Sequence, residues 1–69
     1  MASVHTINAY EKADGWKHIF ETFKHPKDGY MLFCDGNFVT NCNTIIDIEE
    51  EIEDTINWYN WTRLNPNFA

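Results

Sequence analysis

Basic residues are scarce in this sequence, where five Lys and Arg stand against 11 Asp and Glu and the formal net charge is −6. The cations are scattered along the chain, so they form no patch that could follow a phosphate backbone. Long apolar runs are missing too, and no segment approaches the roughly 20 residues of a transmembrane helix. We therefore expect neither direct binding to nucleic acid nor insertion into a membrane.

Cysteine is also rare, with only Cys34 and Cys42 in the chain. Two cysteines do not make the dense disulfide framework of a secreted mini-protein. The first ten residues carry neither a basic leader nor an apolar run, which is not the pattern of a signal peptide. These features favour a cytoplasmic protein with two free thiols.

Motifs for metal binding and catalysis are absent. None of the three His and two Cys residues is spaced as C-x-x-C, H-x-x-x-H or C-x-x-H, the spacings that place two ligands on one turn. No G-x-S-x-G occurs, and Cys34 lies in an apolar run where a packed, inert thiol is expected. A chain this short also has little room for a cleft that excludes water. We expect no metal, no cofactor and no catalytic residue, and hence no enzyme.

What the sequence does contain is a large number of aromatic residues. Its 69 residues include three Trp, three Tyr and five Phe, and 43% of the chain is hydrophobic. This composition is typical of one small acidic domain over residues 1–69, a length at which a partner or a second copy is often needed for stability. One thin core cannot hide so many rings, so we expect a homo-oligomer or a partner interface.

The segment YMLFCDGNFVTN contains the clearest turn motif. Two β-rich runs flank Asp35-Gly36, and Asp-Gly favours the type I′ turn of a tight hairpin because both central residues need positive φ. The sequence thus predicts a hairpin of residues 30–34 with residues 37–41. Pairing outward from the turn places Leu32 opposite Val39, Phe33 opposite Phe38 and Met31 near Thr40. Both faces of this ribbon are apolar, so it needs cover.

Residues 14–24, DGWKHIFETFK, fit two structures. As a helix, Asp14 caps the start and an i, i+3, i+4, i+7 spacing aligns four apolar residues: Trp16, Ile19, Phe20 and Phe23. As a strand, alternate residues share a face, and residues 4–12 are the partner across an Asp-Gly turn. We favour the helix, which predicts an α+β fold of the order helix, β-hairpin, helix. The alternative is a four-stranded antiparallel meander followed by one C-terminal helix.

Residues 43–62 are predicted to form an amphipathic, acidic C-terminal helix, capped by Asn43 or Thr44. Its core stripe consists of Ile45, Ile48, Ile52, Ile56 and Tyr59. The side away from that stripe carries four acids and two tryptophans: Asp47, Glu50, Glu51, Asp54, Trp58 and Trp61. Exposed tryptophan is uncommon, which indicates a contact surface if the helix stays regular past Asn57. If the helix frays there, both tryptophans can turn inward.

The acids of this segment are dense. Six carboxylates between residues 47 and 54 give about one charge per 1.8 Å of helix, against roughly one per 1.7 Å of duplex DNA. We therefore predict a non-enzymatic inhibitor that imitates DNA on a basic surface of a nucleic-acid-handling protein. The four outer acids supply the field, and Trp58 and Trp61 are the anchors. An ordinary solvated helix face is the plainer interpretation.

In its size, acidity, richness in Asn and tryptophan-bearing acidic helix, the chain resembles the small accessory proteins with which bacteriophages bind and block host enzymes. The resemblance implies a role in host takeover or anti-defence, in the host cytoplasm. The alternative function is a homo-oligomeric module that buries its hairpin and tryptophans against another copy and could sequester a small nucleotide-like ligand.

Overall fold

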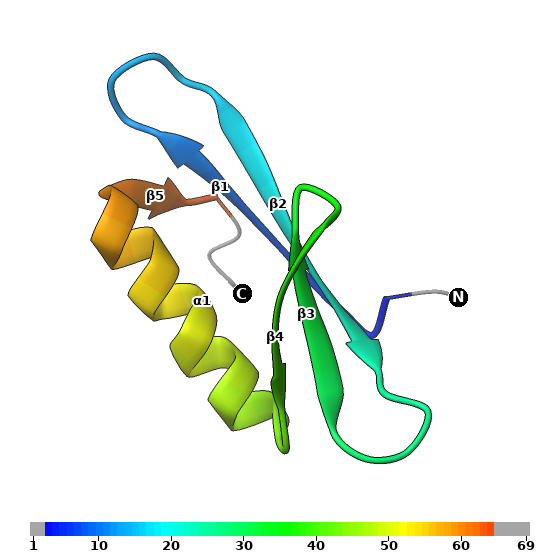
Figure 1. Ribbon diagram of the computed structural model, residues 1–69. Helices are drawn as coiled ribbons and strands as arrows, with labels where there is room; N and C mark the ends of the chain where they lie inside the picture. The colour runs from blue at the N-terminus through cyan, green and yellow to red at the C-terminus, as the bar shows by residue number, and fades with distance from the viewer. Residues whose placement is uncertain (1–2, 65–69) are drawn as a thin grey trace.

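The computed structural model of the protein describes residues 3–64 and shows an antiparallel sheet with a helix on one of its faces (Figure 1). The strands are β1 (His5–Glu11), β2 (Lys17–Lys24), β3 (Tyr30–Cys34), β4 (Asn37–Cys42) and β5 (Trp61–Arg63), and helix α1 (Ile45–Tyr59) precedes β5. The order in the sheet is β4-β3-β2-β1-β5. The first four strands therefore form a meander, and the unpredicted β5 extends the sheet beside β1, so that β2 is the middle strand of the five.

The alternative prediction for the fold, a meander followed by a helix, fits this structure, and the preferred helix–hairpin–helix was wrong. Residues 17–24 form β2, which pairs with both β1 and β3. The four residues of the supposed helical stripe are separated in the sheet. Phe20 is buried under α1, its neighbour Ile19 and also Phe23 point to the other face, and Trp16 is 68% exposed before the strand. The helix prediction was wrong because β2 has apolar residues on both faces, so its sequence lacks the alternation of apolar and polar residues that marks a half-buried strand.

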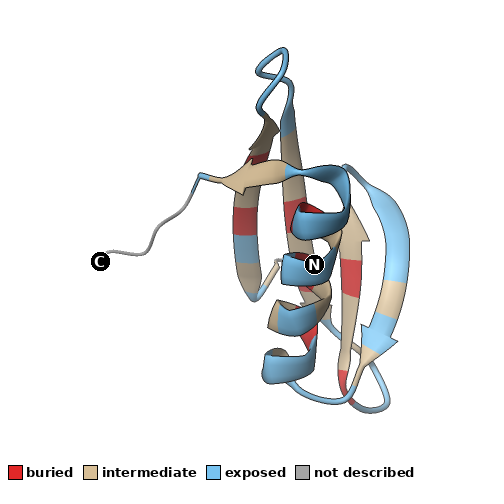
Figure 2. Ribbon diagram, turned by 90° about the vertical axis from the view of Figure 1, so that its left-hand side faces the viewer, coloured by how far each residue is buried: buried red, intermediate tan, exposed pale blue. Residues whose placement is uncertain are grey.

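The core lies between α1 and the facing side of the sheet. Alternate strand residues point toward the helix, and Ile48, Ile52 and Ile56, spaced by four, pack on them. The buried strand residues are Ile7, Ala9, Phe20, Thr22 and Leu32. Figure 2, in which α1 faces the viewer, shows buried segments in red on the strands behind the helix. The three central members of the predicted isoleucine stripe are thus in the core.

Helix α1 begins as the sequence predicted, because the Thr44 hydroxyl accepts a hydrogen bond from the Asp47 N–H at 3.1 Å. It ends at Tyr59, where Asn60 adopts the left-handed conformation (φ 59°, ψ 41°) that commonly terminates helices. The segment predicted over residues 43–62 is therefore helical only from Ile45 to Tyr59. With 15 residues and six acids, α1 is too short and too polar for a membrane span, and the described chain has no other helix.

The β3–β4 hairpin is confirmed, with one change in register. Asp35 and Gly36 both have positive φ (53° and 83°), as the predicted type I′ turn requires. Phe33 lies opposite Phe38, as predicted, but a bulge next to this pair shifts the remaining residues by one. Leu32 pairs with Thr40 instead of Val39, and Met31 with Asn41 instead of Thr40.

Candidate functional site

The six acids of α1 divide into two groups with different surroundings. Glu49 and Glu53 lie beside β5, where Nη1 of Arg63 contacts their carboxylates at 3.3 and 2.9 Å. Nε2 of His5, in β1, also contacts the Glu49 carboxylate. These contacts fasten the helix to two neighbouring strands and neutralise part of its charge.

The other four acids are those that the sequence assigned to the outer face of the helix: Asp47, Glu50, Glu51 and Asp54. Within residues 3–64, no side chain forms an ion pair with their carboxylates. Glu51 is partly buried and the other three are exposed. We call these four residues the outer acids. They give α1 a negative surface that forms no ion pair with the rest of the described chain.

Trp58 lies near the C-terminal end of this surface, with 83% of the residue exposed. Beside it is a hollow of about 340 Å³ lined by Glu51, Asp54, Thr55, Trp58 and Tyr59. The hollow combines two aromatic rings with two carboxylates. Carboxylates pair with the ammonium of Lys or the guanidinium of Arg, and aromatic faces attract the same cations. Its chemistry therefore suits a basic side chain.

Trp61 does not lie on the helix. Asn60 reverses the chain, and Trp61 begins β5, where it is half-buried. Its indole stacks on His18, with centroids 3.8 Å apart, and on Tyr59, with centroids 4.9 Å apart, and it meets Phe20 at a tilt. The two tryptophans that the sequence placed on one helix face thus differ: Trp58 points outward and Trp61 packs inward.

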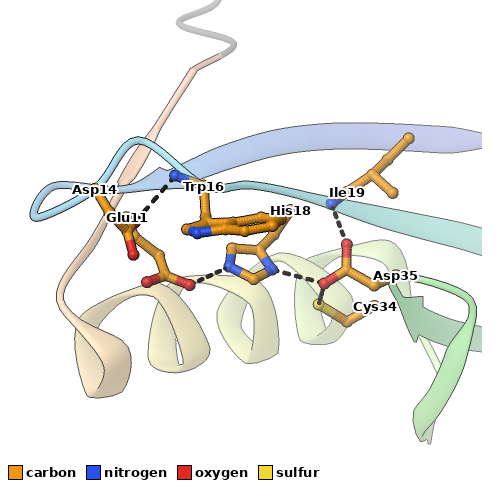
Figure 3. A network of polar contacts seen from close by, with 7 residues as sticks. All are labelled: Glu11, Asp14, Trp16, His18, Ile19, Cys34 and Asp35. Carbon is orange, nitrogen blue, oxygen red and sulfur yellow. Dashed lines mark hydrogen bonds and ion pairs between the residues drawn. The ribbon is translucent and has the colours of Figure 1, made fainter.

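His18 is the centre of a polar cluster that the sequence did not predict (Figure 3). Its Nδ1 lies 2.6 Å from Oδ2 of Asp35, and its Nε2 lies 2.8 Å from Oε2 of Glu11. A neutral imidazole has only one N–H, so two carboxylate contacts at hydrogen-bond distance require the doubly protonated imidazolium. The second Asp35 oxygen accepts a hydrogen bond from the Ile19 N–H at 2.9 Å. The cluster therefore joins β1, β2 and the β3–β4 turn.

These contacts shift the pKa values of His18 and Asp35. Partial burial opposes the charge on His18, but hydrogen bonds to Asp35 and Glu11 and their negative charges outweigh it and raise the pKa of His18 above its ordinary 6.5. Burial likewise opposes ionisation of Asp35, yet hydrogen bonds from His18 and the Ile19 N–H lower its pKa below the ordinary 3.8. Between the pKa of Asp35 and the pKa of His18, the Asp35 carboxylate is an anion and the His18 ring is a cation.

Cys34 lies beside this cluster, in surroundings that disfavour its thiolate form. Burial and the neighbouring Asp35 carboxylate raise the pKa of the Cys34 thiol to about 11, so at neutral pH the thiol is protonated and points to Asp35 at 3.8 Å. Burial also raises the pKa of Cys42. A protonated thiol is a poor nucleophile. Within residues 3–64, no group of three or more His, Cys, Asp and Glu side chains is arranged to hold a metal ion.

No family model, curated protein or solved structure matches the chain.

The sequence does contain two hints of the His18 cluster. Once residues 5–11 and 17–24 are paired as strands, Glu11 and His18 fall on the same face of neighbouring strands. Asp35 occupies a tight turn, where a short carboxylate lies close to backbone N–H groups. Neither hint applies if residues 14–24 form a helix, because His18 then has no neighbouring strand.

Proposed function

We propose that this protein is a small, non-enzymatic binding module that docks the outer face of α1 onto a basic surface of a nucleic-acid-handling protein. It inhibits that protein by occupying its nucleic-acid site. The observation that carries this proposal is the shallow hollow beside Trp58, which the acidic residues Glu51 and Asp54 line together with the aromatic residues Trp58 and Tyr59. A helix face that only keeps a protein soluble does not need an indole that is 83% exposed.

The residues of the outer face have separate roles in this proposal. Asp47 and Glu50 contribute a negative field that steers a basic partner toward the helix. Glu51 and Asp54 receive a cationic side chain in the hollow. Trp58 is the anchor, because a large aromatic ring excludes water from the contact and is typical of binding hot spots.

Trp61 was predicted as a second anchor, and that role stays a prediction. In the present proposal Trp61 is a positioning residue. Its indole stacks on Tyr59 with planes at 18°, and the Tyr59 ring is one wall of the hollow. Loss of Trp61 is therefore expected to loosen the hollow without removing a group that touches the partner.

The field of α1 is weaker than the sequence alone suggested. Because Arg63 contacts Glu49 and Glu53, the four outer acids remain over roughly 10 Å of helix, which is about one charge per 2.6 Å. Duplex DNA carries roughly one per 1.7 Å. We therefore infer a partial imitation of DNA, in which the contact made by Trp58 supplies affinity that charge alone would not.

The test compares two exposed tryptophans. Trp58→Ala removes the ring beside the hollow, and Trp16→Ala is a matched control because Trp16 is 68% exposed but lies before β2. The immobilised protein and both variants are used to capture partners from an extract of the cells in which the protein acts. We expect one basic protein to be retained by the wild type and by Trp16→Ala, and lost with Trp58→Ala.

Two measurements on the purified partner then separate the parts of the proposal. Raising the salt from about 50 to about 500 mM is expected to weaken binding by roughly tenfold or more. Added protein is expected to release a labelled duplex from the partner. Equal capture by Trp58→Ala and the wild type contradicts the anchor, and an affinity indifferent to salt contradicts the electrostatic contact. A partner that keeps its nucleic acid contradicts the inhibition.

A further inference from the structure

The face of the sheet opposite α1 is left uncovered by residues 3–64 (Figure 1). Side chains alternate along a strand, so the residues between the buried positions point away from the helix. The apolar residues on that side are Tyr10, Ile19, Phe23, Met31, Phe33 and Phe38. We call this side of the sheet the open face.

Three phenylalanine rings form a continuous patch on the open face. Phe33 makes edge-to-face contacts with Phe23, with centroids 5.5 Å apart, and with Phe38, with centroids 5.7 Å apart. Phe38 nevertheless remains 56% exposed. A hollow of about 370 Å³ beside the rings is lined by Phe23, Phe33, Met31, Glu21 and Gly36. An exposed aromatic patch on the free side of a two-layer fold is typical of a contact surface.

The distribution of charge favours a second copy of the chain over a strongly charged partner as the occupant of the open face. Among the strand residues on this face, only Lys17 and Glu21 are charged, so the face is neutral although the chain carries −6. The six acids of α1 lie on the opposite side of the sheet. Two copies that meet through their open faces therefore keep their acidic helices as far apart as the fold allows, which minimises repulsion. A strongly basic or acidic partner finds no complementary charge here.

We propose that the open face is the contact between two copies of this chain. The copies form a homodimer with four layers in the order helix, sheet, sheet, helix. The sheets would lie about 10 Å apart, as in other sheet-on-sheet packings. A two-fold contact uses the same patch on both copies, and Lys17 and Glu21 give that patch both signs of charge. This dimer does not depend on the docking function of α1, which it leaves exposed on both outer sides.

The area of the face sets the expected affinity. Five strands about 4.8 Å apart, each roughly six residues long at about 3.3 Å per residue, make a face of about 20 by 20 Å. Side-chain relief raises the surface buried per copy to roughly 400–700 Å², below the roughly 800 Å² of a standard interface. We therefore expect a reversible dimer with a dissociation constant in the micromolar range.

Sedimentation equilibrium of the full chain between about 1 and about 500 µM tests this dimer. Phe38→Glu places a charge in the contact. Ile46→Glu is the matched control, because Ile46 is 70% exposed on α1 and the change in charge is the same. We expect the wild type and Ile46→Glu to dimerise alike, and Phe38→Glu to dimerise at least tenfold more weakly with an unchanged circular dichroism spectrum.

Thr6→Glu, at an exposed position on the same face of β1, is a second probe that leaves the phenylalanine patch intact. If Phe38→Glu alters the fold, Thr6→Glu takes its place in the test, and it too is expected to weaken the dimer. A wild type that stays monomeric throughout this range overturns the proposal. So does a dimer that Ile46→Glu disrupts and Phe38→Glu does not. A monomer that binds a different protein through Phe38 assigns the face to that protein and overturns it as well.

Discussion

The imidazole of His18 lies flat against the indole of Trp61, with centroids 3.8 Å apart and planes inclined by 9°. Trp61 also stacks on Tyr59, the last residue of α1. A protonated imidazole attracts an aromatic face more strongly than a neutral one does. The charge on His18 and the position of the C-terminal end of the helix are therefore linked.

The first prediction concerns stability against pH. Because the folded state raises the pKa of His18, its contribution is complete below pH 6.5 and is lost as the pH rises through the folded value. The folded state lowers the pKa of Asp35, so that contribution is present above pH 3.8 and is lost as the pH falls through its folded value. Urea unfolding is expected to show greatest stabilisation by the cluster between these limits.

A neutral variant isolates the histidine in that experiment. His18→Gln is expected to lower the free energy of unfolding by about 2 kcal/mol at pH 5, as for the loss of hydrogen bonds to charged groups. The difference from the wild type is expected to shrink above the folded pKa. Nuclear magnetic resonance titration of the ring gives that pKa directly, and a value below 6.5 contradicts stabilisation of the charged ring by Asp35 and Glu11.

The second prediction separates the two tryptophans at the end of α1. Trp61→Ala removes a half-buried ring with three aromatic contacts and is expected to cost about 2–3 kcal/mol, somewhat less than for a fully buried ring. Trp58→Ala is expected to cost less than about 0.5 kcal/mol, since Trp58 is largely exposed. Thermal unfolding measures both, and equal losses would show that Trp58 also supports the fold.

The third prediction compares two glycines with the same backbone angle. Gly15 and Gly29 both have φ of 77°, but a Cβ at Gly29 would come within 2.5 Å of the Cys42 carbonyl oxygen, whereas a Cβ at Gly15 meets nothing within 4 Å. Gly15→Ala therefore bears only the left-handed strain of about 1 kcal/mol. Gly29→Ala must also displace backbone and is expected to cost at least about 2 kcal/mol more. Similar costs in chemical denaturation would contradict this close approach.

The fourth prediction concerns the residue that reverses the chain after α1. Asn60 has φ of 59°, a conformation that glycine and asparagine tolerate and β-branched residues do not. Asn60→Gly is expected to keep or slightly raise stability, and Asn60→Val to lower it by about 1–2 kcal/mol. The Trp61 emission spectrum, measured in a Trp16→Phe and Trp58→Phe background, is expected to shift to the red in Asn60→Val alone. An unshifted spectrum would mean that the stack on His18 forms without this turn.

Local rules were sufficient for parts of this fold. The Asp35-Gly36 turn and the Thr44 cap were predictable because each depends on the preferences of two to four neighbouring residues. The outer acids and the exposed Trp58 were predictable for a similar reason, since helical periodicity alone separates them from the isoleucine stripe.

Long-range contacts account for what the sequence did not predict. Residues 17–24 form a strand because both β1 and β3 pair with them. These pairings cannot be predicted from the spacing of apolar residues in a segment that is apolar on both faces. The bulge between Leu32 and Phe33, which the sequence also did not predict, shifts the register of the hairpin by one residue. The His18 cluster combines groups from three segments, and Trp61 joins it only because Asn60 ends the helix. None of these contacts is encoded in the spacing of neighbouring residues.

The pairing of β5 with β1 also bears on the order in which the chain folds. Ala9 lies opposite Arg63, so this contact closes a loop that contains all the other elements, and closing so long a loop is entropically unfavourable and slow. We expect β5 to dock last, onto a meander already packed against α1. Until then the outer edge of β1 offers unpaired backbone groups to which another chain can add a strand. Once docked, the three residues of β5 cover this edge, so we expect them to protect the folded protein, and not its folding intermediate, against the addition of a foreign strand.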